Sequence, residues 1–122
     1  MILLDTLAFL WIEQHRPRVR ALLRGDRRLF ISPAMLLELQ VLHEAGRFRL
    51  TSHGVDEIVH DERWTLDEPP AAAWFLRAID IGWTRDPFDR LLAAHAQVRG
   101  WRLATADQHL LQHLGPGAAM EL

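Results

Sequence analysis

The stretch Ile2-Leu-Leu-Asp-Thr-Leu-Ala-Phe-Leu-Trp11 decides the fold class of this chain. Its apolar start, residues 2–4, predicts a short buried strand that ends at the polar pair Asp5 and Thr6. From residue 7 to residue 14 the apolar side chains recur at helical spacing. A strand followed directly by a helix is a βα unit, which is typical of α/β proteins.

The rest of the sequence continues this alternation. Further strands are expected at 29–31 and 101–104, with an extended segment at 64–66, and helices are expected at 16–24, 33–45, 54–60, 71–80, 86–99 and 107–114. Ser32 and Asp86 are suitable N-caps, and Gly46 and Gly100 are suitable helix ends. We therefore predict one three-layer α/β/α domain over residues 1–122, with a mainly parallel central sheet.

Composition excludes several classes of function. The chain has 122 residues, of which 49% are hydrophobic and 25% charged, as in a single globular domain. It contains no cysteine, which removes thiolate metal sites, cysteine nucleophiles and disulfides. All 14 basic residues are arginine, so P-loop and Schiff-base chemistry are also absent. No apolar run is long enough for a membrane span or resembles a secretory signal, and we expect a cytoplasmic protein.

Acidic side chains are expected to gather at one edge of the sheet. Asp5 and Asp107 each follow a predicted strand, and ligands bind outside the carboxyl ends of parallel strands. Glu38 falls on a helix face shared with the apolar residues Ala34, Met35, Val41, Leu42 and Ala45. Asp89 stands in the first turn of its helix, one turn after Asp86. Carboxylates that converge would repel one another unless a divalent cation compensates them, and oxygen ligands favour Mg²⁺ or Mn²⁺.

Each acidic residue also has an ordinary structural interpretation. Asp5 can accept hydrogen bonds from loop amides, and Glu38 can pair with an arginine. Asp86, Asp89 and Asp107 can all be explained as helix-capping residues, which is the preferred role for Asp86. The seven histidines are scattered and suggest no role, and nothing in the sequence supports base stacking on Trp64 or Trp83.

Four segments resemble one known family in order and spacing. MILLDT at 1–6, LELQVLHEAGRF at 37–48, RDPFDRLLAAHA at 85–96 and LATADQHL at 103–110 are similar to PIN-domain ribonucleases, and in particular to the VapC-type toxins of toxin–antitoxin pairs. The segment at 85–96 is the most specific to this family. The similarity extends over essentially the whole chain and is weakest over residues 51–81.

The resemblance implies an activity and a set of site residues. It implies an endoribonuclease that uses one or two Mg²⁺ or Mn²⁺ ions, with Asp5, Glu38, Asp89 and Asp107 as its acidic quartet. Thr6, Asp86 and Thr105 would support the quartet. Hydrolysis by in-line attack of water would leave a 5′-phosphate and a 3′-hydroxyl. The resemblance further implies a homodimer and a small antitoxin that covers the site.

Arginines are the candidate contacts to an RNA backbone or to an acidic antitoxin. Six of them lie between residues 16 and 28 against the single Asp26, and the candidates are Arg16, Arg20, Arg27 and Arg85. A merely solvated basic face is the simpler explanation for this segment, and Arg85 and Arg90 are expected to pair with nearby carboxylates. The alternative function is a PIN-like scaffold that binds RNA or protein without turnover.

Overall fold

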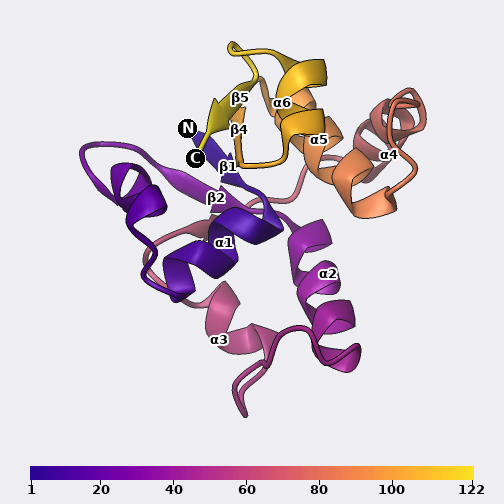
Figure 1. Cartoon of the computed structure of the whole chain (residues 1–122). Coiled ribbons are helices and arrows are strands. Elements are labelled where there is room, and N and C mark those ends of the chain that lie inside the picture. Colours follow the sequence, from indigo (N-terminus) through magenta and orange to yellow (C-terminus); the bar gives the residue numbers. More distant parts are fainter.

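Strand β1 lies at the centre of a five-stranded sheet in which every neighbouring pair is parallel. The computed structural model describes residues 1–122, and the strand order is β3-β2-β1-β4-β5 (Figure 1). The strands are β1 (Ile2–Leu4), β2 (Leu29–Ile31), β3 (Thr65–Leu66), β4 (Arg102–Thr105) and β5 (Ala119–Glu121). The predicted α/β class is confirmed, and the sheet is entirely parallel.

Seven helices connect the strands. They are α1 (Thr6–Glu13), the 3₁₀ helix η1 (Pro17–Leu23), α2 (Pro33–Glu44), α3 (Val55–Val59), α4 (Ala71–Ile79), α5 (Pro87–Arg99) and α6 (Gln108–Leu114). The predicted caps Ser32 and Asp86 are confirmed, because each side chain accepts from backbone N–H groups of the first helical turn. Gly100 ends α5 with φ +69°, a conformation that suits glycine.

Two elements differ from the sequence-based prediction. The segment predicted as a helix over 16–24 is a 3₁₀ helix, in which the buried Val19 and Leu22 are spaced one 3₁₀ turn apart. Strand β5 was not predicted at all, since Gly115-Pro-Gly-Ala-Ala-Met120 has little intrinsic strand propensity. It forms because Ala119 pairs with Leu103 and Met120 pairs with Ala104 of β4.

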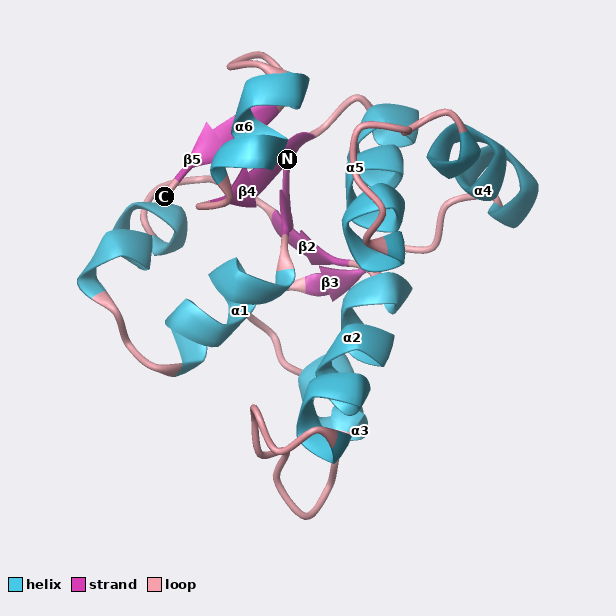
Figure 2. Ribbon diagram, turned by 45° about the vertical axis from the view of Figure 1, so that its right-hand side comes forward, coloured by secondary structure: helices cyan, strands magenta, loops and turns pink.

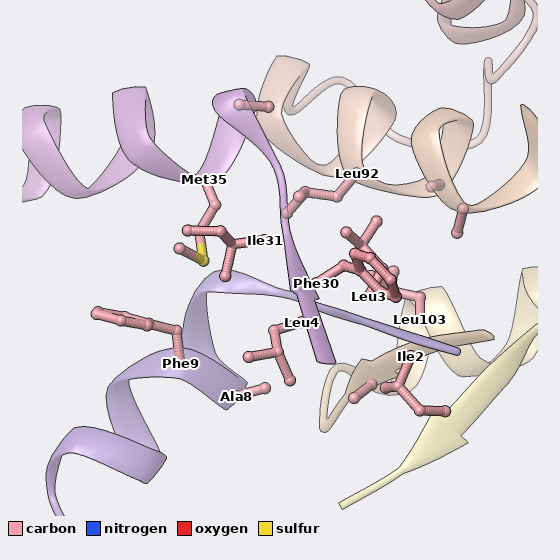
Figure 3. Packing of buried hydrophobic residues seen from close by; sticks show 14 of the residues in the cluster. Ile2, Leu3, Leu4, Ala8, Phe9, Phe30, Ile31, Met35, Leu92 and Leu103 are labelled. Atoms are coloured by element: carbon pink, nitrogen blue, oxygen red, sulfur yellow. The ribbon is translucent and has the colours of Figure 1, made fainter. Parts of the chain in front are cut away.

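Helices cover both faces of the sheet. α1 and η1 lie on one side, and α5 and α6 lie on the other, with α4 packed outside α5 (Figures 1 and 2). In Figure 3, Leu3, Phe30 and Leu103 point toward Leu92 of α5, while Leu4 points toward Ala8 of α1. The central strand is therefore buried on both faces. None of the helices is long and apolar enough to cross a membrane.

This two-sided core predicts a large effect of truncation in β4. Replacing the fully buried Leu103 by alanine should lower the free energy of unfolding by about 2–5 kcal/mol, because the cavity left behind cannot collapse between two helical layers. Urea denaturation followed by circular dichroism measures this change. Leu23→Ala is the matched control, because that side chain is 50% exposed and should cost less than about 1 kcal/mol. Equal losses in the two variants would contradict the assigned core.

Candidate functional site

A cavity of about 210 Å³ opens at the carboxyl edge of the sheet, between α1, α2, α5 and α6. The structure brings together in its wall all four carboxylates that the sequence analysis singled out, and Thr6 beside them. The complete lining is Asp5, Thr6, Leu7, Leu10, Glu38, Leu42, Asp89, Leu92, Asp107 and Leu110. The site is therefore an acidic cavity with leucine walls.

Asp5 is the most deeply buried of the four carboxylates. It follows β1 and caps α1, and its Oδ1 accepts from the backbone N–H of Ala8 at 2.7 Å. Burial raises the pKa of Asp5 to about 6, while hydrogen bonds from Thr105 and Ala8 act in the opposite direction. The negative charges of Glu38 and Asp107 are smaller contributions to the same rise. Asp5 thus satisfies local amides, as its structural interpretation expects, and also faces the cavity.

Glu38 reaches the cavity from the second turn of α2. Its carboxylate accepts a hydrogen bond from the Thr6 hydroxyl, and its burial raises its pKa, with a further contribution from the charge of Asp86. The expected apolar stripe around Glu38 is only partly present, because Val41 is 45% exposed. Ala45 is exposed as well, so the end of α2 leaves the core. The expected arginine partner of Glu38 is absent.

Asp89 has the most perturbed environment of the four. Burial raises its pKa to about 7, and the charges of Asp86, Asp107, Glu38 and Asp5 add to the shift in that order. Asp86 itself caps α5, since its Oδ1 accepts from the backbone N–H groups of Phe88 at 2.8 Å and of Asp89 at 3.2 Å. The preferred capping role of Asp86 is confirmed, and its exposed carboxylate also adds negative charge to the site.

Asp107 and Thr105 come from the end of β4. The Oδ1 of Asp107 accepts from the backbone N–H groups of His109 at 2.8 Å and Leu110 at 3.1 Å, and so caps α6. The buried hydroxyl of Thr105 accepts from the backbone N–H of Asp107 at 3.0 Å and also hydrogen-bonds Asp5. Thr105 therefore connects the carboxylate of Asp5 with the backbone of Asp107.

No arginine neutralises these acids. The expected pairing of Arg85 and Arg90 with nearby carboxylates is wrong, because the only ion pairs of the chain involve Arg63, His95 and Arg99. Arg90 instead donates from Nε to the backbone carbonyl of Thr84 at 2.8 Å. The negative charges of the cavity are left without a protein cation.

The donor set fits a hard divalent cation in its chemistry, since it consists of carboxylate and hydroxyl oxygens in a cavity without a competing cation. Its geometry is less complete. No group of three or more histidine or acidic side chains stands close enough together to hold a metal ion as the residues lie. The carboxylates surround the cavity without converging on one point.

The predicted basic contacts lie outside this cavity. Arg16, Arg20 and Arg27 are exposed on and around η1. Arg16 contacts Gln14 and lies near the ring of Trp11, and Arg27 donates to the carbonyl of Ala21. Arg85 is exposed one residue before the cap of α5, and is the candidate nearest the acidic residues in sequence.

Two features of the molecule were missed by sequence reasoning. The first is the set of leucine walls, for which a signal exists: Leu42, Leu92 and Leu110 each follow a cavity carboxylate by one helical turn. The second is a cluster outside the cavity lining, in which basic side chains neutralise an acid. The carboxylate of Asp67 accepts from His95 Nε2 at 2.7 Å and from Arg99 Nε at 2.8 Å. Helical spacing relates His95 to Arg99, but nothing in the sequence indicates Asp67 as their partner.

The acidic cavity lies where the parallel sheet reverses its strand order. This is the usual position of a ligand site in an open α/β fold, so the protein is an α/β protein with an acidic site at that position. The family model described as PIN domain matches residues 2–114, and the chain belongs to the PIN domain family. No curated protein sequence is significantly similar to it.

Solved structures share the fold. A chain of a toxin–antitoxin complex from Klebsiella pneumoniae superposes with a TM-score of 0.72 at 15% identity, over 100% of both chains. A chain of VapBC2 from Rickettsia felis, bound to a DNA fragment from their promoter, gives a TM-score of 0.70 at 18% identity, over 100% of this chain and 99% of that one. FitAcB from Neisseria gonorrhoeae gives 0.55 at 25% identity, over 92% and 91%.

The raised pKa of Asp89 predicts that its ionised form destabilises the fold. The folded pKa of about 7 lies above the ordinary value of 3.8, so stability falls as pH rises between these values and the full penalty applies above pH 7. In buffer without divalent ions, Asp89→Asn should be more stable than the unmutated chain at pH 8 by about 1–2 kcal/mol after allowance for solvent screening.

Thermal and urea unfolding at pH 8 and pH 4 measure this difference, which should shrink toward pH 4. Asp26→Asn is the control, since Asp26 is exposed and remote from the cavity lining. A pH-independent gain, or a gain of equal size in the control, would contradict the electrostatic origin.

Proposed function

We propose that this chain is a Mg²⁺- or Mn²⁺-dependent endoribonuclease that hydrolyses RNA phosphodiester bonds, and that it is the toxin of a toxin–antitoxin pair in the cytoplasm. One observation carries the proposal: four carboxylates line one cavity at the carboxyl edge of the sheet, with no protein cation to compensate them. Membership of the PIN domain family supports a nuclease, and the superposed chains from toxin–antitoxin complexes support the toxin role.

The four cavity carboxylates Asp5, Glu38, Asp89 and Asp107 would hold one or two ions. Bound by these residues, a divalent cation would supply Lewis-acid activation of water and would neutralise charge on the phosphate. The protein residues provide the setting for this chemistry. Thr6 orients Glu38, Thr105 connects Asp5 with Asp107, and the Asp86 cap fixes the start of the helix that carries Asp89. The leucine walls make the cavity less polar and so strengthen the charge interactions in it.

RNA contacts outside the cavity would come from arginine. Arg85 lies next to the α5 cap, where it can contact a phosphate that flanks the cavity. Arg16, Arg20 and Arg27 provide a separate basic surface around η1 that suits an RNA backbone or an acidic segment of the antitoxin. Both sets of contacts would weaken as salt concentration rises.

Two apolar surfaces fit the expected protein partners. Leu7, Leu37 and Val41 are between 38% and 57% exposed on α1 and α2, beside the cavity, where an apolar segment of an antitoxin can cover the site. On the opposite side of α5, Phe75 and Ile79 of α4 are 51% and 68% exposed. We assign this α4 surface to the homodimer contact, because its exposed side chains continue into a shallow apolar hollow formed with α5.

The homodimer assignment predicts that a charge on α4 separates the protomers. Ile79→Glu should shift the purified chain from dimer to monomer in analytical ultracentrifugation, because the burial of an unpaired carboxylate costs several kcal/mol. Leu23→Glu, at another exposed leucine on η1, should leave the dimer intact. A monomer without any mutation, or dissociation by the control alone, would contradict the assignment.

A non-catalytic PIN-like scaffold is the second candidate function. The incomplete convergence of the carboxylates favours it, since no ready-made metal-binding group is present. Mn²⁺ titration separates the two candidates. A catalytic site should bind Mn²⁺ stoichiometrically and lose it in Asp5→Asn, whereas a scaffold should bind it weakly and without dependence on Asp5.

The nuclease proposal predicts metal-dependent RNA cleavage. The purified chain, incubated with total cellular RNA, should produce discrete fragments with Mg²⁺ or Mn²⁺ and none with EDTA. Asp89→Asn should lower the cleavage rate at least about a hundredfold, because one ligand of the cation is lost. Fragment ends are identified by their 5′-phosphate and 3′-hydroxyl.

Loss of cleavage in Asp89→Asn, purified in the same way, excludes a contaminating nuclease. Asp26→Asn is the matched control for the substitution itself and should cleave at the unmutated rate. If Asp89→Asn cleaves as well as the unmutated chain, Asp89 has only a structural role at the start of α5, and the scaffold becomes the better description of this protein.

A further inference from the structure

Three aromatic rings gather at α6, the helix that Asp107 caps. The indole of Trp83 lies 4.5 Å from the imidazole of His113 and 5.4 Å from that of His109, measured between ring centroids. The two imidazoles are 4.5 Å apart, and no pair of the three rings is inclined by more than 26°. We call these three side chains the aromatic platform.

The aromatic platform is connected to two of the three helix starts that carry cavity carboxylates, those of α5 and α6. His109 is in the first turn of α6, and its backbone N–H donates to Asp107. Trp83 is followed by Thr84, whose hydroxyl accepts from the backbone N–H of Asp86 at 3.2 Å. Arg90 of α5 donates to the carbonyl of Thr84. These bonds hold the platform in a fixed position relative to the site.

Folding alone accounts for only part of this arrangement. Trp83 is half-buried and one part of it packs against the hydrophobic core, which fixes the ring. Both histidines are exposed, however. The ring of His109 makes no hydrogen bond. The ring of His113 makes one, with the backbone carbonyl of His109 in its own helix. Two solvent-exposed imidazoles are thus held nearly parallel to a half-buried indole, close in the chain to Asp86 and Asp107.

We infer that the aromatic platform stacks an unpaired RNA base next to the phosphate that is cleaved. This inference rests on the proposed function and names the part of the RNA that the site recognises. Aromatic rings bind nucleobases of any sequence through their π-faces, and they reach only bases that are splayed out of a helix. Arg85, exposed two residues after Trp83, is placed to contact the adjoining phosphate. The site therefore selects single-stranded segments or loops.

The test compares RNA with and without bases. Two fluorescein-labelled probes are used, hexa-adenylate and a hexamer of abasic ribose phosphate, and their binding is measured by anisotropy in the Asp89→Asn background. In that background, Trp83→Ala should weaken hexa-adenylate binding about tenfold, since stacking on one aromatic ring is worth about 1–3 kcal/mol per base. Binding of the abasic hexamer should not change.

Matched variants separate stacking from a structural role. Trp83→Phe should restore most of the affinity for hexa-adenylate, and His113→Ala should weaken it about threefold. His60→Ala, an exposed histidine on another helix end, should have no effect. Equal losses for both probes would mean that Trp83 only anchors its loop. No loss with hexa-adenylate, or no binding of it at all, would equally overturn the platform.

The result is independent of the nuclease test. RNA cleavage that is unaffected in Trp83→Ala, with unchanged hexa-adenylate affinity, would leave the proposed nuclease intact and refute the platform. Trp83-dependent binding of hexa-adenylate by a chain that cleaves no RNA would support the platform and refute the nuclease.

Discussion

The fold depends on the burial of β1 between two layers of helices. Leu3 and Leu4 are fully buried on opposite faces of this three-residue strand, and β2 and β4 pair with it in parallel on either side. Because the chain leaves β1 at the centre of the sheet, Asp5 necessarily emerges between helices from both layers. The end of β4 emerges at the same edge, and Asp107 follows it. The position of the acidic cavity is thus a consequence of parallel pairing around one buried strand.

The same arrangement makes the cavity electrostatically unfavourable. Burial raises the pKa values of Asp5, Glu38 and Asp89, and the carboxylates raise one another's pKa values further. Leucines from the helices that carry these acids increase the desolvation. Functional sites commonly lower stability in this way.

The carboxyl pKa of Asp67 is shifted in the opposite direction to those of the cavity acids. Burial acts to raise the pKa of Asp67, but hydrogen bonds from Arg99 and His95 overcome it, and the pKa lies below its ordinary value. Burial lowers the pKa of His95, whose ring packs edge-on against Trp74. This chain therefore compensates an acid with its own bases where the role is structural. Asp5 and Asp89 have no such basic partner, so their charges are not compensated within the protein.

The sequence by itself determined the βα alternation, the caps Ser32 and Asp86, and the four carboxylates of the site. The alternation and the caps depend on local periodicity and on residue types at strand and helix ends, which a linear pattern contains. The choice of the four carboxylates as one set rested on the resemblance of four sequence segments to the PIN family. Only the tertiary structure decided the existence of β5, the 3₁₀ form of η1, the compensation of Asp67 and the meeting of Trp83 with His109 and His113. Each of these depends on a partner distant in the chain or on packing against another element, and no local pattern specifies that partner.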